Sequence, residues 1–149
     1  MQRIVTALGI ALIIAGIFGK SYTWHYDHRE TATLEDYATT EFLASRDVDG
    51  NLEGANLSLW DYRYDDAKLL KKAILFTDGA PWEVIAATRQ TPGRWRNENK
   101  IFVALPKSSL KDIMVAKEVR FKFFYDNGQT IDLPLGQKEL VAWQRKLRW

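Results

Sequence analysis

Two histidines and one carboxylate make up the densest group of potential metal ligands in the chain. They stand together as His25-Tyr26-Asp27-His28, and imidazole and carboxylate groups are common ligands of zinc. The chain has no other histidine and no cysteine, which excludes a Ser-His-Asp triad elsewhere and any thiolate-bound metal. We interpret the group as a solvated linker, and the sequence predicts neither a metal site nor a cofactor.

An alternating series of oxygen-bearing side chains is the second candidate. It resembles the start of a calcium-binding loop and consists of Asp47, Asp49, Asn51 and Glu53. Such a loop needs glycine at its sixth position and a bidentate glutamate at its twelfth. Here Gly50 is fourth and Ser58 is twelfth, so the segment is predicted to be an acidic loop.

Carboxylates are also the residues that hydrolyse glycosidic bonds when they act in pairs. The candidates for such a pair are Asp61, Asp65, Asp66 and Glu83. Their spacing is equally that of solvated strand ends, and the chain contains no glycine-rich phosphate loop and no G-x-S-x-G motif. We therefore predict no catalytic residue, and a small hydrolase that uses paired carboxylates is the alternative function.

Basic residues beside aromatic ones form the candidate binding surface. Its members are Arg94, Trp95 and Arg96 in a loop, and Arg120 and Lys122 on one face of a strand. Groups of this kind bind nucleic acid, anionic lipid or an acidic protein surface. The choice among these partners depends on where the chain places the domain.

The N-terminal segment predicts a membrane location. Ile4 to Gly19 contains no charge, Arg3 precedes it and Lys20 follows it. If Lys20 extends toward the headgroups, residues 4–24 form a helix of about 31 Å, which matches the ~30 Å hydrocarbon core of a bilayer. A cleaved signal peptide is the alternative, although the end of the run lacks an A-x-A-like site. The anchor is the favoured interpretation.

The predicted topology is single-pass in the inner or plasma membrane. A short basic tail before a first span usually stays in the cytoplasm, so the C-terminal domain is expected in the periplasm or outside the cell. A domain there does not meet nucleic acid. A protein partner or a larger membrane complex is therefore the expected ligand of the basic-aromatic residues.

Small side chains recur along the predicted span at every fourth position, namely Ala7, Ala11, Ala15 and Gly19. Such a face lets a second helix approach closely in lipid. We expect it to mediate contact with a second copy of the chain or with a membrane complex, although alanine and glycine are also common in anchors generally.

The remaining pattern predicts an α+β domain with an antiparallel sheet and two to three helices. We divide the chain into an anchor or uncleaved signal (1–24), a connector (25–32) and the domain (33–149). Helices are expected at 34–45, from 108 onward and at 136–149. Strands are expected at 56–65, 73–77, 82–89, 101–105, 119–125 and 130–135, with loops at 46–56 and 91–100 and a helical turn at 65–72. The Asn127-Gly128 pair predicts a hairpin between the last two strands.

Charge is distributed unevenly along the 149 residues. The net charge of +2 combines residues 31–66, with two basic and nine acidic side chains, and residues 67–149, with sixteen basic and eight acidic ones. With 46% hydrophobic and 27% charged residues, the chain is neither disordered nor polytopic. The expected function is a membrane-anchored binding or accessory module; besides the hydrolase, a secreted soluble binder is the alternative.

Overall fold

The computed structural model describes residues 20–27 and 37–148, with side chains from Thr40 onward. The strands are β1 (Lys20–Asp27), β2 (Tyr37–Arg46), β3 (Leu52–Arg63), β4 (Leu69–Thr77), β5 (Ala80–Pro92), β6 (Asn97–Leu105), β7 (Val119–Tyr125) and β8 (Thr130–Pro134). The helices are α2 (Lys107–Val115) and α3 (Gln137–Arg148). The predicted α+β class with an antiparallel sheet is confirmed, and the domain consists mostly of sheet.

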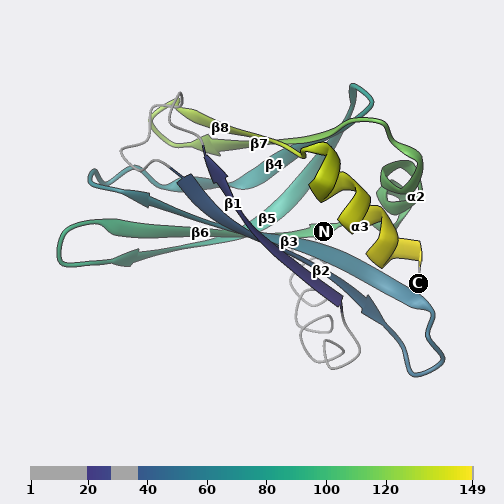
Figure 1. The fold of residues 1–149 in the computed structure, drawn as a ribbon. Coiled ribbons are helices and arrows are strands. Elements are labelled where there is room, and N and C mark those ends of the chain that lie inside the picture. The colour runs from purple at the N-terminus through teal and green to yellow at the C-terminus, as the bar shows by residue number, and fades with distance from the viewer. Residues whose placement is uncertain (1–19, 28–36, 149) are drawn as a thin grey trace.

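The strands form one antiparallel sheet in the order β1-β2-β3-β6-β5-β4-β7-β8. The sheet curls into a half-barrel, and α2 and α3 lie together at one end of it (Figure 1). Side chains alternate between the two faces of each strand, which is clearest in β7, where Val119, Phe121, Phe123 and Tyr125 are buried. These buried positions face the inside of the half-barrel.

Helix α3 fills the apolar end of this interior. Its Trp143 is completely buried and stacks on Phe42 of β2, with ring centroids 4.0 Å apart. The same indole lies 5.8 Å from the ring of Phe121 on β7. One side chain thus connects strands from opposite parts of the curled sheet.

Hydrogen bonds from side chains fix the C-terminal ends of α3 and α2. Arg46 of β2 donates from Nη2 to the carbonyl oxygens of Lys146 (2.9 Å) and Leu147 (3.1 Å), which satisfies carbonyls that the end of α3 leaves unpaired. Gln144 donates to the carbonyls of Ile113 and Ala116, at 3.0 and 2.9 Å, and so joins α3 to the end of α2.

The helix predicted at 34–45 is wrong where the structure describes it. Residues 37–46 form β2, which pairs with both β1 and β3. Phe42 and Ala44 are buried while Glu41 and Leu43 are partly exposed, and this is the two-residue period of a strand. The apolar residues also fit a helical period, and pairing with two neighbouring strands decided between the two.

Several predicted connections are shorter than expected because the strands extend into them. The loop predicted at 46–56 is reduced to a turn around Gly50, where Asp47 Oδ1 accepts backbone N–H groups of Asp49 and Asn51 at 2.9 Å each. The loop at 91–100 is reduced to the turn at 93–96 between β5 and β6. The helical turn predicted at 65–72 is absent; β4 begins at Leu69 instead.

The C-terminal half follows the prediction closely. The β7–β8 hairpin, α2 and α3 occur where the sequence predicts them. Leu140, Trp143 and Leu147 of α3 are buried, whereas Val141 is 40% exposed.

The N-terminal predictions fall mainly outside the described residues. That applies to the apolar run 4–19, including Ala7, Ala11, Ala15 and Gly19, and to residues 28–36. Residues 20–24, predicted to end the membrane span, belong to β1 instead and pair with β2 from Lys20 opposite Ala44 onward. Within the described ranges, no helix has both the length and the apolar character needed to cross a bilayer.

Replacing Trp143 by alanine is expected to lower the free energy of unfolding by about 3–5 kcal/mol, because it removes the buried indole between Phe42 and Phe121. Val141→Ala on the same helix, at a 40% exposed position, is the matched control and should cost less than about 1 kcal/mol. Urea unfolding followed by circular dichroism measures both. Equal losses for the two variants would contradict the role assigned to Trp143.

Candidate functional site

The interior of the half-barrel changes from apolar to polar along its length. On β3, the inward positions Leu57 and Leu59 are followed by Asp61 and Arg63, which are 0% and 1% exposed. Asn99 of β6 lies opposite Asp61 in the register and is 1% exposed. The end of the barrel away from α3 is therefore closed by buried polar groups.

Asp61 and Tyr125 form the centre of this polar end. The Tyr125 hydroxyl donates a short hydrogen bond to Asp61 Oδ2 across the interior. Burial, followed by the charge of Asp61, raises the pKa of Tyr125 far above its usual value of 10. The hydroxyl therefore remains protonated and acts as a donor to the carboxylate.

Arg63 joins the buried pair to the surface. Its Nε donates to Asp65 Oδ1 at 2.7 Å and its Nη2 to Asp65 Oδ2 at 2.5 Å. Nη2 also donates to Gln129, and the guanidinium carbon lies 4.4 Å from the centre of the Tyr125 ring. The hydrogen bonds from Arg63 lower the pKa of Asp65, which stabilises the ionised carboxylate.

This arrangement gives no support to the hydrolase alternative. A general acid in such an enzyme needs a raised pKa, whereas the pKa of Asp65 is lowered and Asp61 is held by Tyr125. The two other carboxylates of the predicted set, Asp66 and Glu83, are exposed. Asn99, at the same end of the interior, also lines a cleft.

That cleft lies where β4 and β5 separate. The two strands pair only from Lys72 opposite Ile85 to Thr77 opposite Ala80, and the pairing of β4 with β7 shifts register between Leu69 and Ala73. Beyond Ile85 an opening of about 410 Å³ remains. The residues lining it are Lys68, Leu69, Lys71, Thr88, Arg89, Gln90, Pro92 and Asn99.

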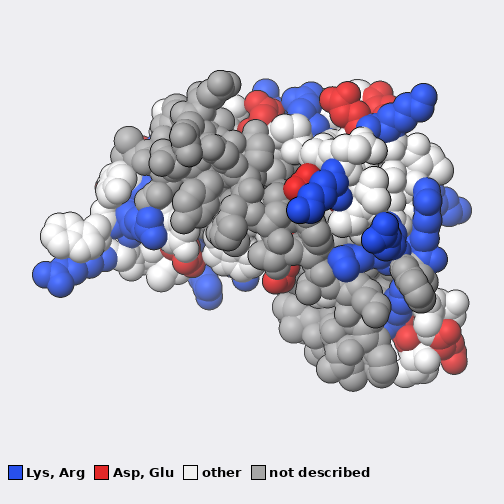
Figure 2. Space-filling view, in the orientation of Figure 1, with Lys and Arg blue, Asp and Glu red and all other residues white. Residues whose placement is uncertain are grey.

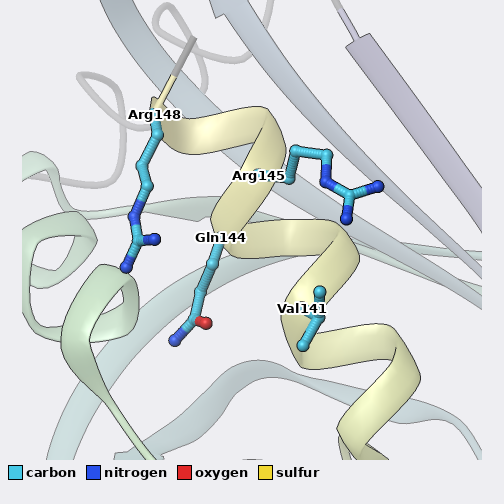
Figure 3. A pocket seen from close by; sticks show the side chains of 4 residues that line it. All are labelled: Val141, Gln144, Arg145 and Arg148. Atoms are coloured by element: carbon cyan, nitrogen blue, oxygen red, sulfur yellow. The ribbon is translucent and has the colours of Figure 1, made fainter.

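A second pocket, of about 520 Å³, lies along α3 and is lined by Val141, Gln144, Arg145 and Arg148. Gln144 and Arg148 point toward α2, whereas Arg145 points away from it (Figure 3). Arg148 donates to the carbonyl of Met114 at 2.7 Å. The polar groups that point toward α2 therefore already serve to hold the two helices together.

The predicted binding residues lie in two places. Arg94, Trp95 and Arg96 form the turn between β5 and β6, where Trp95 is 76% exposed. In Figure 2, basic side chains are visible at the projecting end of this hairpin and along α3. The guanidinium of Arg94 lies 5.3 Å from the Trp95 ring centre, and that of Arg96 lies 4.1 Å from the ring centre of Tyr62.

Arg120 and Lys122 lie on the outer face of β7, on the other side of β4 from the hairpin. Arg120 forms an ion pair with Asp132 at 3.2 Å and stacks on Phe76 at 4.1 Å. Lys122 is partly buried and stands opposite Asp132 in the register. The two residues share one face of the strand, as expected, but they do not join the hairpin turn.

The cleft and the buried polar end were not predicted from the sequence. One signal was available: Asp61 and Arg63 share the β3 face of Leu57 and Leu59. A strand face with that apolar start must be buried, so its charged end needs buried partners. In the part of the chain that the structure describes, no three histidine, cysteine or acidic residues group as metal ligands, and the side chains of His25 and His28 lie outside it.

Comparison of the chain with protein-family models, with curated proteins and with solved structures finds no match. We therefore infer the function from the geometry of the described residues.

Tyr125→Phe is expected to lower the free energy of unfolding by about 1.5–3 kcal/mol, because the buried Asp61 carboxylate loses a charge-assisted hydrogen bond. The control is Tyr62→Phe on the outer face, where the hydroxyl donates to Glu98 at 3.1 Å; its loss should be about 0.5 kcal/mol. Chemical unfolding at pH 7 compares them. A larger effect at Tyr62 would refute the interior role of Tyr125.

Asp65 should make stability fall in acid. Its pKa in the folded state lies below the ordinary value of 3.8, so the stabilisation is complete above about pH 5 and is lost as the pH falls through the folded-state pKa. The difference in unfolding free energy between wild type and Asp65→Asn should therefore be constant from pH 7 to 5 and shrink below. Asp66→Asn is the control, and a difference that grows in acid would contradict the ion pair.

Proposed function

We propose that this chain is a membrane-anchored, non-catalytic binding module whose β5–β6 hairpin turn docks on an acidic surface of a protein partner. The anchor is the N-terminal apolar segment that begins at Ile4, predicted from the sequence over residues 4–24, with the domain in the periplasm or outside the cell. The partner is a separate protein or a subunit of a larger membrane complex.

The exposure of Trp95 carries the docking proposal. An indole that is 76% exposed at the tip of a hairpin has little role in folding stability. Tryptophan and arginine are the residue types that dominate binding energy at protein interfaces. Between Arg94 and Arg96, the ring combines a large apolar surface with two cations, which suits an acidic surface that also has an apolar recess.

The sheet supports this turn from below. Arg96 stacks on Tyr62 at 4.1 Å, and Lys100 stacks on Trp60 at 4.8 Å, both across the β3–β6 pair. The Tyr62 hydroxyl also donates to Glu98. These contacts hold the base of the hairpin in place, so little conformational entropy has to be lost when the turn binds.

The other predicted residues fit the proposal less directly. Arg120 forms an ion pair with Asp132, and both Arg120 and Lys122 lie on the other side of β4 from the turn. We assign the docking contact to Arg94, Trp95 and Arg96, with Arg120 and Lys122 as part of a basic surround. The face of Ala7, Ala11, Ala15 and Gly19 would contribute lateral contacts within the bilayer.

The test is capture of partners by the full-length chain from detergent-solubilised membranes, quantified by mass spectrometry. Arg94→Glu/Arg96→Glu and, separately, Trp95→Ala should lower the recovery of one protein by about 30-fold, as expected for loss of an interface hot spot. Enrichment of a specific protein that depends on neither the two arginines nor Trp95 would overturn the proposal.

Matched controls exist on α2. Lys107→Glu/Lys111→Glu makes the same change in charge at exposed positions, and Val115→Ala truncates a side chain that is also 76% exposed. Both should leave recovery unchanged. If the lysine reversal reduces recovery as strongly as the arginine reversal, overall charge rather than the hairpin mediates binding, and the proposal fails.

A further inference from the structure

The cleft between β4 and β5 has the composition of an anion-binding site. Three of its lining residues are cations, Lys68, Lys71 and Arg89, and all three are exposed at its rim. No carboxylate is among the described residues that line it. Three positive charges around one opening, with no carboxylate among its lining residues, favour an anionic occupant.

The floor of the cleft presents an unused hydrogen-bond donor. The side-chain oxygen Oδ1 of Asn99 accepts a hydrogen bond from Gln90 Nε2 at 3.1 Å. The same Nε2 donates to the backbone carbonyl of Ala67, also at 3.1 Å. Asn99 is 1% exposed, and its Nδ2 is buried with no partner among the described residues. A buried donor of this kind costs about 1–3 kcal/mol when it stays unpaired, so an oxygen atom of a ligand would relieve that cost.

The strand geometry explains why a cleft opens beside this buried donor. β5 pairs with β4 only as far as Ile85, while it continues along β6 to Pro92 opposite Asn97. The stretch from Thr88 to Gln90 therefore has a free edge. Side chains from both faces of β5 line the cleft along that edge. Thr88 and Gln90 belong to one face, and Arg89 belongs to the other.

We propose that this cleft binds a small ligand with a terminal phosphate group, held by Lys68, Lys71 and Arg89 and by the Asn99 side-chain amide. A phosphate monoester carries a charge of about −1.5 to −2 at pH 7 and three acceptor oxygens. It therefore matches three cations and a buried donor better than a carboxylate does. The volume of about 410 Å³ leaves room for a small organic group next to the phosphate.

This site is separate from the hairpin turn and does not depend on the docking proposal. The experiment is a titration of the full-length, 15N-labelled chain in maltoside detergent, observed through the side-chain amide signals of Asn99 and Gln90. The probes are inorganic phosphate, glycerol 3-phosphate and dimethyl phosphate, with chloride at matched ionic strength. Dimethyl phosphate is a singly charged diester and represents the chemistry of a lipid headgroup.

Inorganic phosphate and glycerol 3-phosphate should shift the Asn99 amide signals in a saturable way, and chloride should not. Lys71→Gln/Arg89→Gln should weaken binding by about tenfold or more, whereas Lys107→Gln/Lys111→Gln on α2 should leave it unchanged. Because the cleft lysine and arginine are exposed, this variant should keep its fold, which the unchanged β7–β8 signals would verify.

Three results would overturn the proposal. One is equal binding by the cleft variant and its control; another is an unchanged Asn99 signal while signals elsewhere move. The third is binding of dimethyl phosphate as tight as that of the monoester, which would assign the cleft to a lipid headgroup.

Discussion

The fold depends on the contact that Trp143 makes inside the half-barrel. An antiparallel sheet that curls without closing leaves an apolar concave face, and water must be excluded from that face. α3 places one large ring against Phe42 of β2 and Phe121 of β7. Arg46 and Gln144 then fix the helix at its end and against α2. The apolar end is thereby filled, and the opposite end is left for polar residues.

The described ion pairs each lie within one of the two oppositely charged segments of the chain. The acidic segment 31–66 and the basic segment 67–149 do not neutralise each other through the ion pairs described. Arg63–Asp65 lies within the first segment and Arg120–Asp132 within the second. Basic residues of the second segment lie at the β5–β6 turn and around the β4–β5 cleft. This is the physical basis of both binding proposals.

Local sequence signals were sufficient for the C-terminal half. The Asn127-Gly128 turn, the alternation in β7 and the helical spacing of Leu140, Trp143 and Leu147 each specify their element without distant partners. β2 could not be predicted in this way, because Phe42 fits a helix and a strand equally and its neighbours β1 and β3 decide. The cleft was beyond prediction for a related reason: it exists because β4 and β5 stop pairing at Ile85. The exposed Arg94-Trp95-Arg96 turn, in contrast, was visible from residue types alone.

Both proposals place binding at the end of the half-barrel away from the filled core. Amide hydrogen exchange of the full-length chain, measured with and without its captured partner, tests that claim most directly. We expect slower exchange at residues 93–97 in the complex, with no change in α3. Slower exchange in α3 or across Arg120–Lys122, with the hairpin turn unchanged, would contradict it.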